Sequence, residues 1–185
     1  MFNINDIKNG MTISYEGNIY LVLEFQHVKP GKGPAFIRIK LKNLRTKSTI
    51  DKTFNTNIKL EKAHIDKKKM QFLYSQGTDY QFMDLETFDQ IGIEESVIKD
   101  LVKFLKEGLE VTIMFYQGEI IDIELPDKIE MEVTEADPGV KGNTAQSAGK
   151  NATLETGLVI EVPLFIEAGE KIIVNTKDGK YGGRA

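Results

Sequence analysis

The chain has 185 residues, a formal net charge of −4 and no cysteine, which excludes disulfides, thiolate metal sites and a thiol nucleophile. Its two histidines, His27 and His64, cannot by themselves form a typical zinc site. The first residues lack the charged and apolar regions of a signal peptide, and no apolar run approaches the length of a membrane span. We therefore expect a soluble cytoplasmic protein with no membrane partner.

Charge is distributed unevenly along the chain. Residues 1–63 carry 11 Lys/Arg against 5 Asp/Glu, residues 64–127 carry 6 against 14, and residues 128–185 carry 7 against 9. The basic first third indicates a polyanionic partner, because neutralising phosphates releases counterions and drives association. The acidic middle argues against nucleic acid surrounding the whole molecule, and favours solvent or a basic protein there.

Residues 1–63 are predicted to form a small SH3-like barrel of the KOW type. Gly17-Asn18 is a hairpin-turn signal between two apolar runs. Four or five short strands in about sixty residues suit a barrel, which closes its own edges and needs little core. The expected strands cover residues 11–16, 19–25, 36–44 and 49–54.

Residues 64–127 are predicted to form a second barrel, of the oligonucleotide-binding (OB) type, in which strands surround one helix. The helix is expected over 94–106, where Val97, Ile98, Leu101, Val102 and Leu105 fall on one helical face. Gly108 follows it as a stop signal. The expected strands cover residues 70–75, 80–85, 109–116 and 119–125.

Residues 128–185 are predicted to form a third, helix-free barrel, again of the OB type. Pro126-Asp127 marks the joint before it, and residues 128–133 alternate as a half-buried strand does. Residues 137–151 are rich in Gly, Ser, Thr and Asn, which is typical of a linker or a functional loop. Strands resume over 153–166 and 171–176. No clear internal sequence repeat is present.

The most informative motif is the segment Lys29-Pro30-Gly31-Lys32-Gly33-Pro34, between two predicted strands. Proline restricts φ and glycine permits tight reversals, so the segment predicts a rigid turn with Lys32 at its tip. The ammonium would be held away from the protein body, where it could reach a narrow site on a partner. The alternative is a solvated hairpin lysine without a function.

Downstream of that loop, Arg38, Lys40 and Lys42 recur at every second position and line one face of a strand. This face is either a phosphate-contact surface or an ordinary solvent-facing side of a barrel. The acidic residues between 79 and 95 lack the spacing of a calcium loop. We expect no catalytic residues, no metal site and no cofactor.

Two separate parts of the sequence resemble the bacterial translation elongation factor P family. One is the run from Phe25 to Phe36 around Lys32, continuing through Arg38 to Thr46. The other is a spaced carboxy-terminal signature, Lys150-x-Ala152, Gly157, Ile160, Val162-Pro163, Ile166 and Gly169, followed by Tyr181 and Arg184. Together these matches extend over essentially the whole chain.

The resemblance implies a monomer of three β-barrels, L-shaped and similar to tRNA in outline. It implies binding to ribosomal RNA between the P and E sites, next to P-site peptidyl-tRNA or initiator tRNA. It also implies relief of stalls at consecutive prolines, without catalysis by the factor itself. Lys32 matches the residue that family members direct toward the peptidyl transferase centre.

Further site residues carry over from the resemblance. Lys29, Arg38, Lys40 and Lys42 on the first domain, and Tyr181 and Arg184 near the end, match positions expected to contact tRNA or rRNA. The segment Gly142-Asn143-Thr144-Ala145 matches the loop expected near the E-site codon, although many members have aspartate where this chain has Asn143.

Lys32 is also a candidate modification site, which would make a modifying enzyme a further partner. The flanking prolines Pro30 and Pro34 resemble the subgroup whose lysine works unmodified, so we expect a bare lysine.

Four alternatives stay open at this point. An elongation-factor-P-like paralogue shares the fold but differs around the tip loop. Initiation factor 5A has only two domains. A general RNA-binding protein made of β-barrels needs exposed aromatic residues for base stacking. An enzyme acting through a Lys32 Schiff base needs a desolvated lysine, whereas a Gly/Pro hairpin tip predicts an exposed one.

Overall fold

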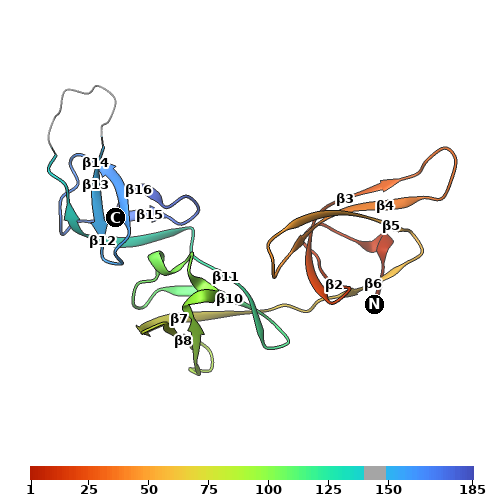
Figure 1. The fold of residues 1–185 in the computed structure, drawn as a ribbon, viewed down its shortest axis with the longest axis horizontal. Helices are drawn as coiled ribbons and strands as arrows, with labels where there is room; N and C mark the ends of the chain where they lie inside the picture. Colours follow the sequence, from red (N-terminus) through yellow and green to blue (C-terminus); the bar gives the residue numbers. More distant parts are fainter. Residues whose placement is uncertain (140–148) are drawn as a thin grey trace. The chain divides into compact units, whose positions relative to one another are not determined.

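The computed structural model describes residues 1–139 and 149–185. Its contacts group the chain into two compact units. Unit 1 contains residues 1–68 and 113–122, and unit 2 contains residues 69–112 and 123–185. The strands form three separate, barrel-like sheets (Figure 1). The predicted all-β class is confirmed. Within the described residues, no helix is long and apolar enough to cross a bilayer.

The first sheet has six strands in the order β1-β6-β2-β3-β4-β5. Every second residue of β4 is buried, with Ile37, Ile39 and Leu41 each 0% exposed, because successive side chains of a strand point to opposite faces. Short β1 and β6, which the sequence did not predict, pair through Phe2 and Leu60. The strands are β1 (Phe2–Asn3), β2 (Thr12–Tyr15), β3 (Asn18–Val28), β4 (Phe36–Asn43), β5 (Thr49–Asn55) and β6 (Lys59–Lys62), with a 3-10 turn at Ile4–Asp6.

The second sheet has the order β11-β10-β7-β8-β9. Phe82 is fully buried on β8 and contacts Phe72 of β7, with ring centroids 5.4 Å apart. The strand β9 was not predicted. The strands are β7 (Asp66–Gln76), β8 (Asp79–Asp84), β9 (Gln90–Glu94), β10 (Glu110–Tyr116) and β11 (Glu119–Glu124).

The helix predicted over 94–106 is wrong in length. The segment contains a four-residue α-helix, α1 (Glu95–Ile98), and a 3-10 helix, η2 (Val102–Phe104). The Leu101 N–H donates to the Ile98 carbonyl, and the Phe104 N–H donates to the Leu101 carbonyl. These i→i−3 hydrogen bonds of the 3-10 type replace the i→i−4 bonds of a regular α-helix. Val97 is 59% exposed, so the apolar stripe is not covered along its length. Ile98 and Leu105 are buried, but an apolar face that is covered only in part does not stabilise a helix over the whole segment.

The third sheet has the order β14-β13-β12-β15-β16 and contains no helix in its described part. The segment predicted as strand over 153–166 is divided by a turn at Gly157. The φ of Gly157 is +86°, in the left-handed region that glycine adopts readily. The polar segment 137–151 ends in strand rather than loop, since β13 begins at Gly149. The strands are β12 (Lys128–Ala136), β13 (Gly149–Leu154), β14 (Val159–Pro163), β15 (Lys171–Asn175) and β16 (Lys180–Arg184).

Candidate functional site at the Lys32 hairpin

The loop that contains Lys32 connects the two longest neighbouring strands of the first sheet. The last pair in the β3–β4 register is Val28 with Phe36, so residues 29–35 form the loop and Lys32 is its central residue. In Figure 1 this hairpin extends beyond the rest of its sheet. Residues 29–34 are all exposed. The structure therefore places Lys32 at an exposed hairpin tip, as the sequence predicts. The role of this lysine stays a prediction.

Gly33 determines the path of the loop after Lys32. Its φ is +107°, a conformation that glycine adopts readily and other residues avoid. A Cβ atom placed there would meet only Pro30 Cγ, at 4.0 Å, so the requirement for glycine is conformational rather than steric. Gly31, on the other side of Lys32, has no positive φ. The two glycines therefore have different roles in the loop.

The ammonium of Lys32 has no carboxylate within ion-pair distance among the residues that the structure describes. Its position at an exposed tip leaves it hydrated and able to reorient on a flexible four-carbon stem. The hairpin thus combines a restrained backbone with a free cationic side chain. Such a cation can bind phosphate or ribose oxygens of a partner without first breaking an internal ion pair.

The basic face of β4 is present as predicted, but its three cations are not equivalent. Lys40 pairs with Glu24 at 2.9 Å, and the hydrogen bond and charge of Glu24, with a contribution from Asp51, raise the pKa of Lys40. Both acids lie directly across from Lys40 on neighbouring strands. Arg38 and Lys42 have no such partner in the described part of the chain. The strand register, which sequence reasoning did not assign, decides this difference.

The predicted residues at the carboxy-terminal end lie on β16. Arg184 pairs with Glu170 at 3.2 Å, and its guanidinium lies 4.5 Å from the ring centroid of Phe165. Tyr181 is half-buried opposite Val174. These residues belong to unit 2, whereas Lys32 belongs to unit 1. The predicted codon-side loop, Gly142 to Ala145, lies outside the described residues.

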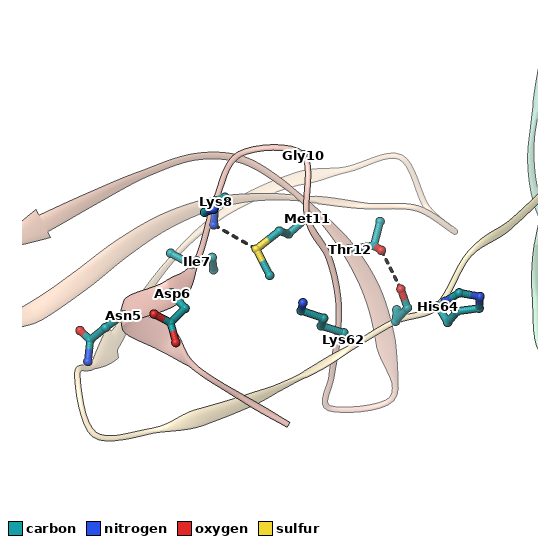
Figure 2. A pocket seen from close by; sticks show the side chains of 10 residues that line it. Asn5, Asp6, Ile7, Lys8, Gly10, Met11, Thr12, Lys62 and His64 are labelled. Carbon is teal, nitrogen blue, oxygen red and sulfur yellow. Dashed lines mark hydrogen bonds between the residues drawn. The ribbon is translucent and has the colours of Figure 1, made fainter.

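A groove of about 760 Å³ lies on the first barrel near the amino terminus. Figure 2 shows the Lys8 backbone N–H directed at Met11 Sδ. The Thr12 hydroxyl donates to the Ala63 carbonyl at 2.7 Å. Its charged lining residues Asp6, Lys8 and Lys62 are exposed, so the groove does not desolvate a reacting group. In the described parts of the chain, no group of three or more His, Cys, Asp or Glu side chains could hold a metal ion.

Comparison with known protein families decides the assignment. Residues 3–60 match the elongation factor P KOW-like domain, residues 65–123 the elongation factor P OB domain, and residues 129–184 the elongation factor P carboxy-terminal domain. The chain belongs to the elongation factor P family. It is therefore a translation elongation factor, and its site of action is the ribosome.

Solved structures are consistent with this assignment. The chain is similar to translation initiation factor 5A from Methanococcus jannaschii, with a TM-score of 0.54 and 27% identity over 66% of this chain and 92% of that one. A translation initiation factor 5A family protein from Naegleria fowleri has a TM-score of 0.51 and 17% identity over 65% of this chain and 94% of its own, which shows a shared fold alone. The match of residues 129–184 favours elongation factor P over a two-domain factor.

Proposed function

We propose that this factor binds between the ribosomal P and E sites and stimulates peptide-bond formation at consecutive prolines by holding P-site tRNA. The observation that carries the proposal is the geometry of the β3–β4 hairpin. Lys32 is exposed at the centre of a proline-braced loop, and within the described residues it has no ion-pair partner. It is thus suited to extend along the tRNA acceptor end toward the peptidyl transferase centre.

The proposed action is positioning rather than chemistry by the factor. Proline is a poor nucleophile, and its ring restricts the nascent chain, so the reacting groups rarely reach attack geometry. Fixing the acceptor end raises the fraction of productive encounters. Contacts to phosphate and ribose hold the tRNA in position without recognising its base sequence. Because Pro30 and Pro34 fix φ on both sides of Lys32, less entropy is lost when the loop binds.

The exposed cations of the hairpin supply further contacts in this proposal. Lys29, Arg38 and Lys42 bind RNA phosphates directly, whereas Lys40 contributes less because Glu24 already neutralises it. Near the small subunit, Tyr181 and Arg184 approach the P-site tRNA. There Arg184 exchanges its contact with Glu170 for a phosphate.

Several finer statements belong to the same proposal. Lys32 acts unmodified, as its flanking prolines Pro30 and Pro34 suggest, and no modifying enzyme is then needed. The factor works as a cytoplasmic monomer. Its domains cover residues 1–63, 64–127 and 128–185, which the separate sheets and the three matched segments support. An intact mass of native-source protein with an added group on Lys32 would contradict the unmodified state.

The decisive experiment uses reconstituted ribosomes stalled on a message with three consecutive proline codons. Purified unmodified factor is expected to restore synthesis, and Lys32→Ala to lower the rate at least roughly tenfold. Lys59→Ala, a change of an exposed lysine elsewhere on the same barrel, serves as the matched control and retains full rescue. If the purified unmodified factor fails to restore synthesis, the experiment is repeated with native-source protein. If that protein fails as well, the proposed function is wrong and the paralogue is favoured.

A further inference from the structure

Two residues of β16, Tyr181 and Arg184, lie three positions apart in the chain but face the same side of the third sheet. Tyr181 lies opposite Val174, and Arg184 lies opposite Ile172, which is only two positions away on β15. The register shift between these pairs is a β-bulge, in which β16 carries one extra residue. Directly opposite residues of an antiparallel pair share a face, so a regular strand would turn Arg184 away from Tyr181. The bulge therefore sets the direction of Arg184.

Arg184 reaches from this face to the segment that follows β14. Strands β14 and β16 are the two edges of the sheet, and they contact each other (Figure 1). Phe165 follows shortly after Pro163, the last residue of β14. The guanidinium of Arg184 lies over the Phe165 ring, 4.5 Å from its centroid, and its Nη2 is 3.2 Å from Glu170 Oε1. The guanidinium thus contacts both an aromatic ring and a carboxylate.

Phe165 contributes little to the core of the third barrel. It is 56% exposed, whereas the next residue, Ile166, is fully buried. The side chains of Arg184 and Glu170 are 56% and 34% exposed, and an ion pair in contact with water stabilises a fold only weakly. Stability therefore gives no reason for this arrangement. The contacts instead restrict a long, flexible arginine side chain to the region above the ring.

Glu170 is fixed to its own loop and not only to Arg184. Its second carboxylate oxygen, Oε2, accepts the Glu167 N–H at 2.6 Å, so the carboxylate can stay in place when Arg184 contacts another anion. Within the described residues Glu170 is the one ion-pair partner of Arg184, and most N–H donors of the guanidinium remain available. The ring contacts the face of the guanidinium, whereas acceptors bind its edge. A phosphate can therefore replace Glu170 without displacing the ring contact.

We propose that Phe165 is a positioning residue for RNA binding. It holds the Arg184 guanidinium in place while the edge of that group passes from Glu170 to a backbone phosphate of the P-site tRNA. A guanidinium that is already positioned loses less entropy when it binds. Glu170 acts in the opposite direction, because it neutralises the guanidinium until a phosphate competes with it. This inference rests on the proposed function, since it deepens the contact proposed there between Arg184 and P-site tRNA.

Affinity for ribosomes with and without P-site tRNA tests this role. The full-length factor is titrated onto both kinds of ribosome, and the ratio of the two dissociation constants measures the tRNA-dependent part of binding. Phe165→Leu keeps an apolar side chain without the aromatic face, and is expected to weaken binding about threefold when P-site tRNA is present. Binding to ribosomes without tRNA should be unchanged. Phe165→Tyr retains the ring and should bind like the unaltered factor.

Val159→Ala is the matched control, because Val159 is another apolar residue of the same barrel that is 56% exposed. This change should leave both affinities unaltered. Equal weakening by Phe165→Leu with and without tRNA, or no weakening at all, overturns the inference. If the unaltered factor itself gains no affinity from P-site tRNA, the proposed function fails as well.

A double-mutant cycle shows whether Phe165 acts through Arg184. Arg184→Ala is expected to weaken tRNA-dependent binding roughly tenfold. Phe165→Leu should cause no further loss in that background, because no guanidinium remains to be positioned. Additive losses would assign Phe165 an independent contact or a structural role, and would contradict the proposal. Unchanged binding of Arg184→Ala would contradict it too.

Glu170→Gln tests the competing carboxylate. The amide oxygen can still accept the Glu167 N–H, so the loop conformation is preserved while the negative charge is lost. Binding in the presence of P-site tRNA is expected to become about threefold tighter at low salt, and only while Arg184 is present. Unchanged or weaker binding of this variant would show that Glu170 does not compete with the phosphate, which is incompatible with the proposed exchange.

Discussion

At the scale of single residues, Gly33 offers a test of how far backbone conformation controls the hairpin. Its φ of +107° penalises any Cβ atom, whereas Gly31 lies in open space without a positive φ. We expect Gly33→Ala to cost the functional loop conformation about 1–2 kcal/mol and to slow rescue of proline stalls accordingly. The matched change Gly31→Ala should have little effect. Equal rescue rates for the two variants would contradict this explanation.

Lys150 is a second residue whose environment gives a definite expectation. Its side chain is 4% exposed and lies 3.5 Å from Glu167, and among the described residues its ammonium has no hydrogen-bond partner. Desolvation of a buried charge outweighs one contact with an exposed carboxylate. We therefore expect Lys150→Met to leave the free energy of unfolding unchanged or raise it by up to about 2 kcal/mol. Glu167→Gln should lower the free energy of unfolding. Urea unfolding of the two variants measures both changes.

At the scale of elements, the tip of the β10–β11 hairpin is held against the first sheet. Arg45 donates to both carboxylate oxygens of Glu119, at 3.3 and 3.0 Å, and Lys47 lies 3.3 Å from Asp122. Ile121 also packs with Ile19, Leu44 and Ala63 in an apolar cluster. The forked geometry of Arg45 and Glu119 makes this pair stronger than an ordinary exposed ion pair.

A double-mutant cycle of Arg45→Ala and Glu119→Ala tests that contact. We expect a coupling free energy of about 1 kcal/mol that declines with added salt. The single-contact surface pair Lys171 and Glu130, at 3.5 Å, serves as the reference and should show less coupling. Equal coupling for the two pairs would mean that the forked geometry adds nothing.

Local patterns predicted most elements, and the failures share a cause. Alternation along residues 35–42 and 128–133 identified β4 and β12, because each strand buries one face. Strands β1 and β6 were missed, since two to four residues become strand only when Phe2 meets Leu60. The helix over 94–106 was overestimated because periodicity does not reveal which apolar residues find a partner.

At the scale of the whole molecule, the uneven charge predicts salt-dependent binding to the ribosome. Arg38→Ala and Lys42→Ala should each reduce the slope of log affinity against log salt by about 0.7–0.9, the value for one phosphate contact. Lys40→Ala should change it less, because Glu24 already pairs with that ammonium at 2.9 Å. Equal slopes for the three variants would show that this internal ion pair opens on binding.

The sequence by itself determined the fold class and the exposed lysine, because these depend on side-chain alternation and on local backbone chemistry at Pro30, Gly33 and Pro34. It also indicated the family, through the resemblance of two separate segments. Only the tertiary structure decided which charged side chains are held in internal ion pairs. Strand register places Glu24 across from Lys40, and chain folding brings Glu170 to Arg184. Pairings between residues far apart in the chain follow from packing, and no local pattern encodes them.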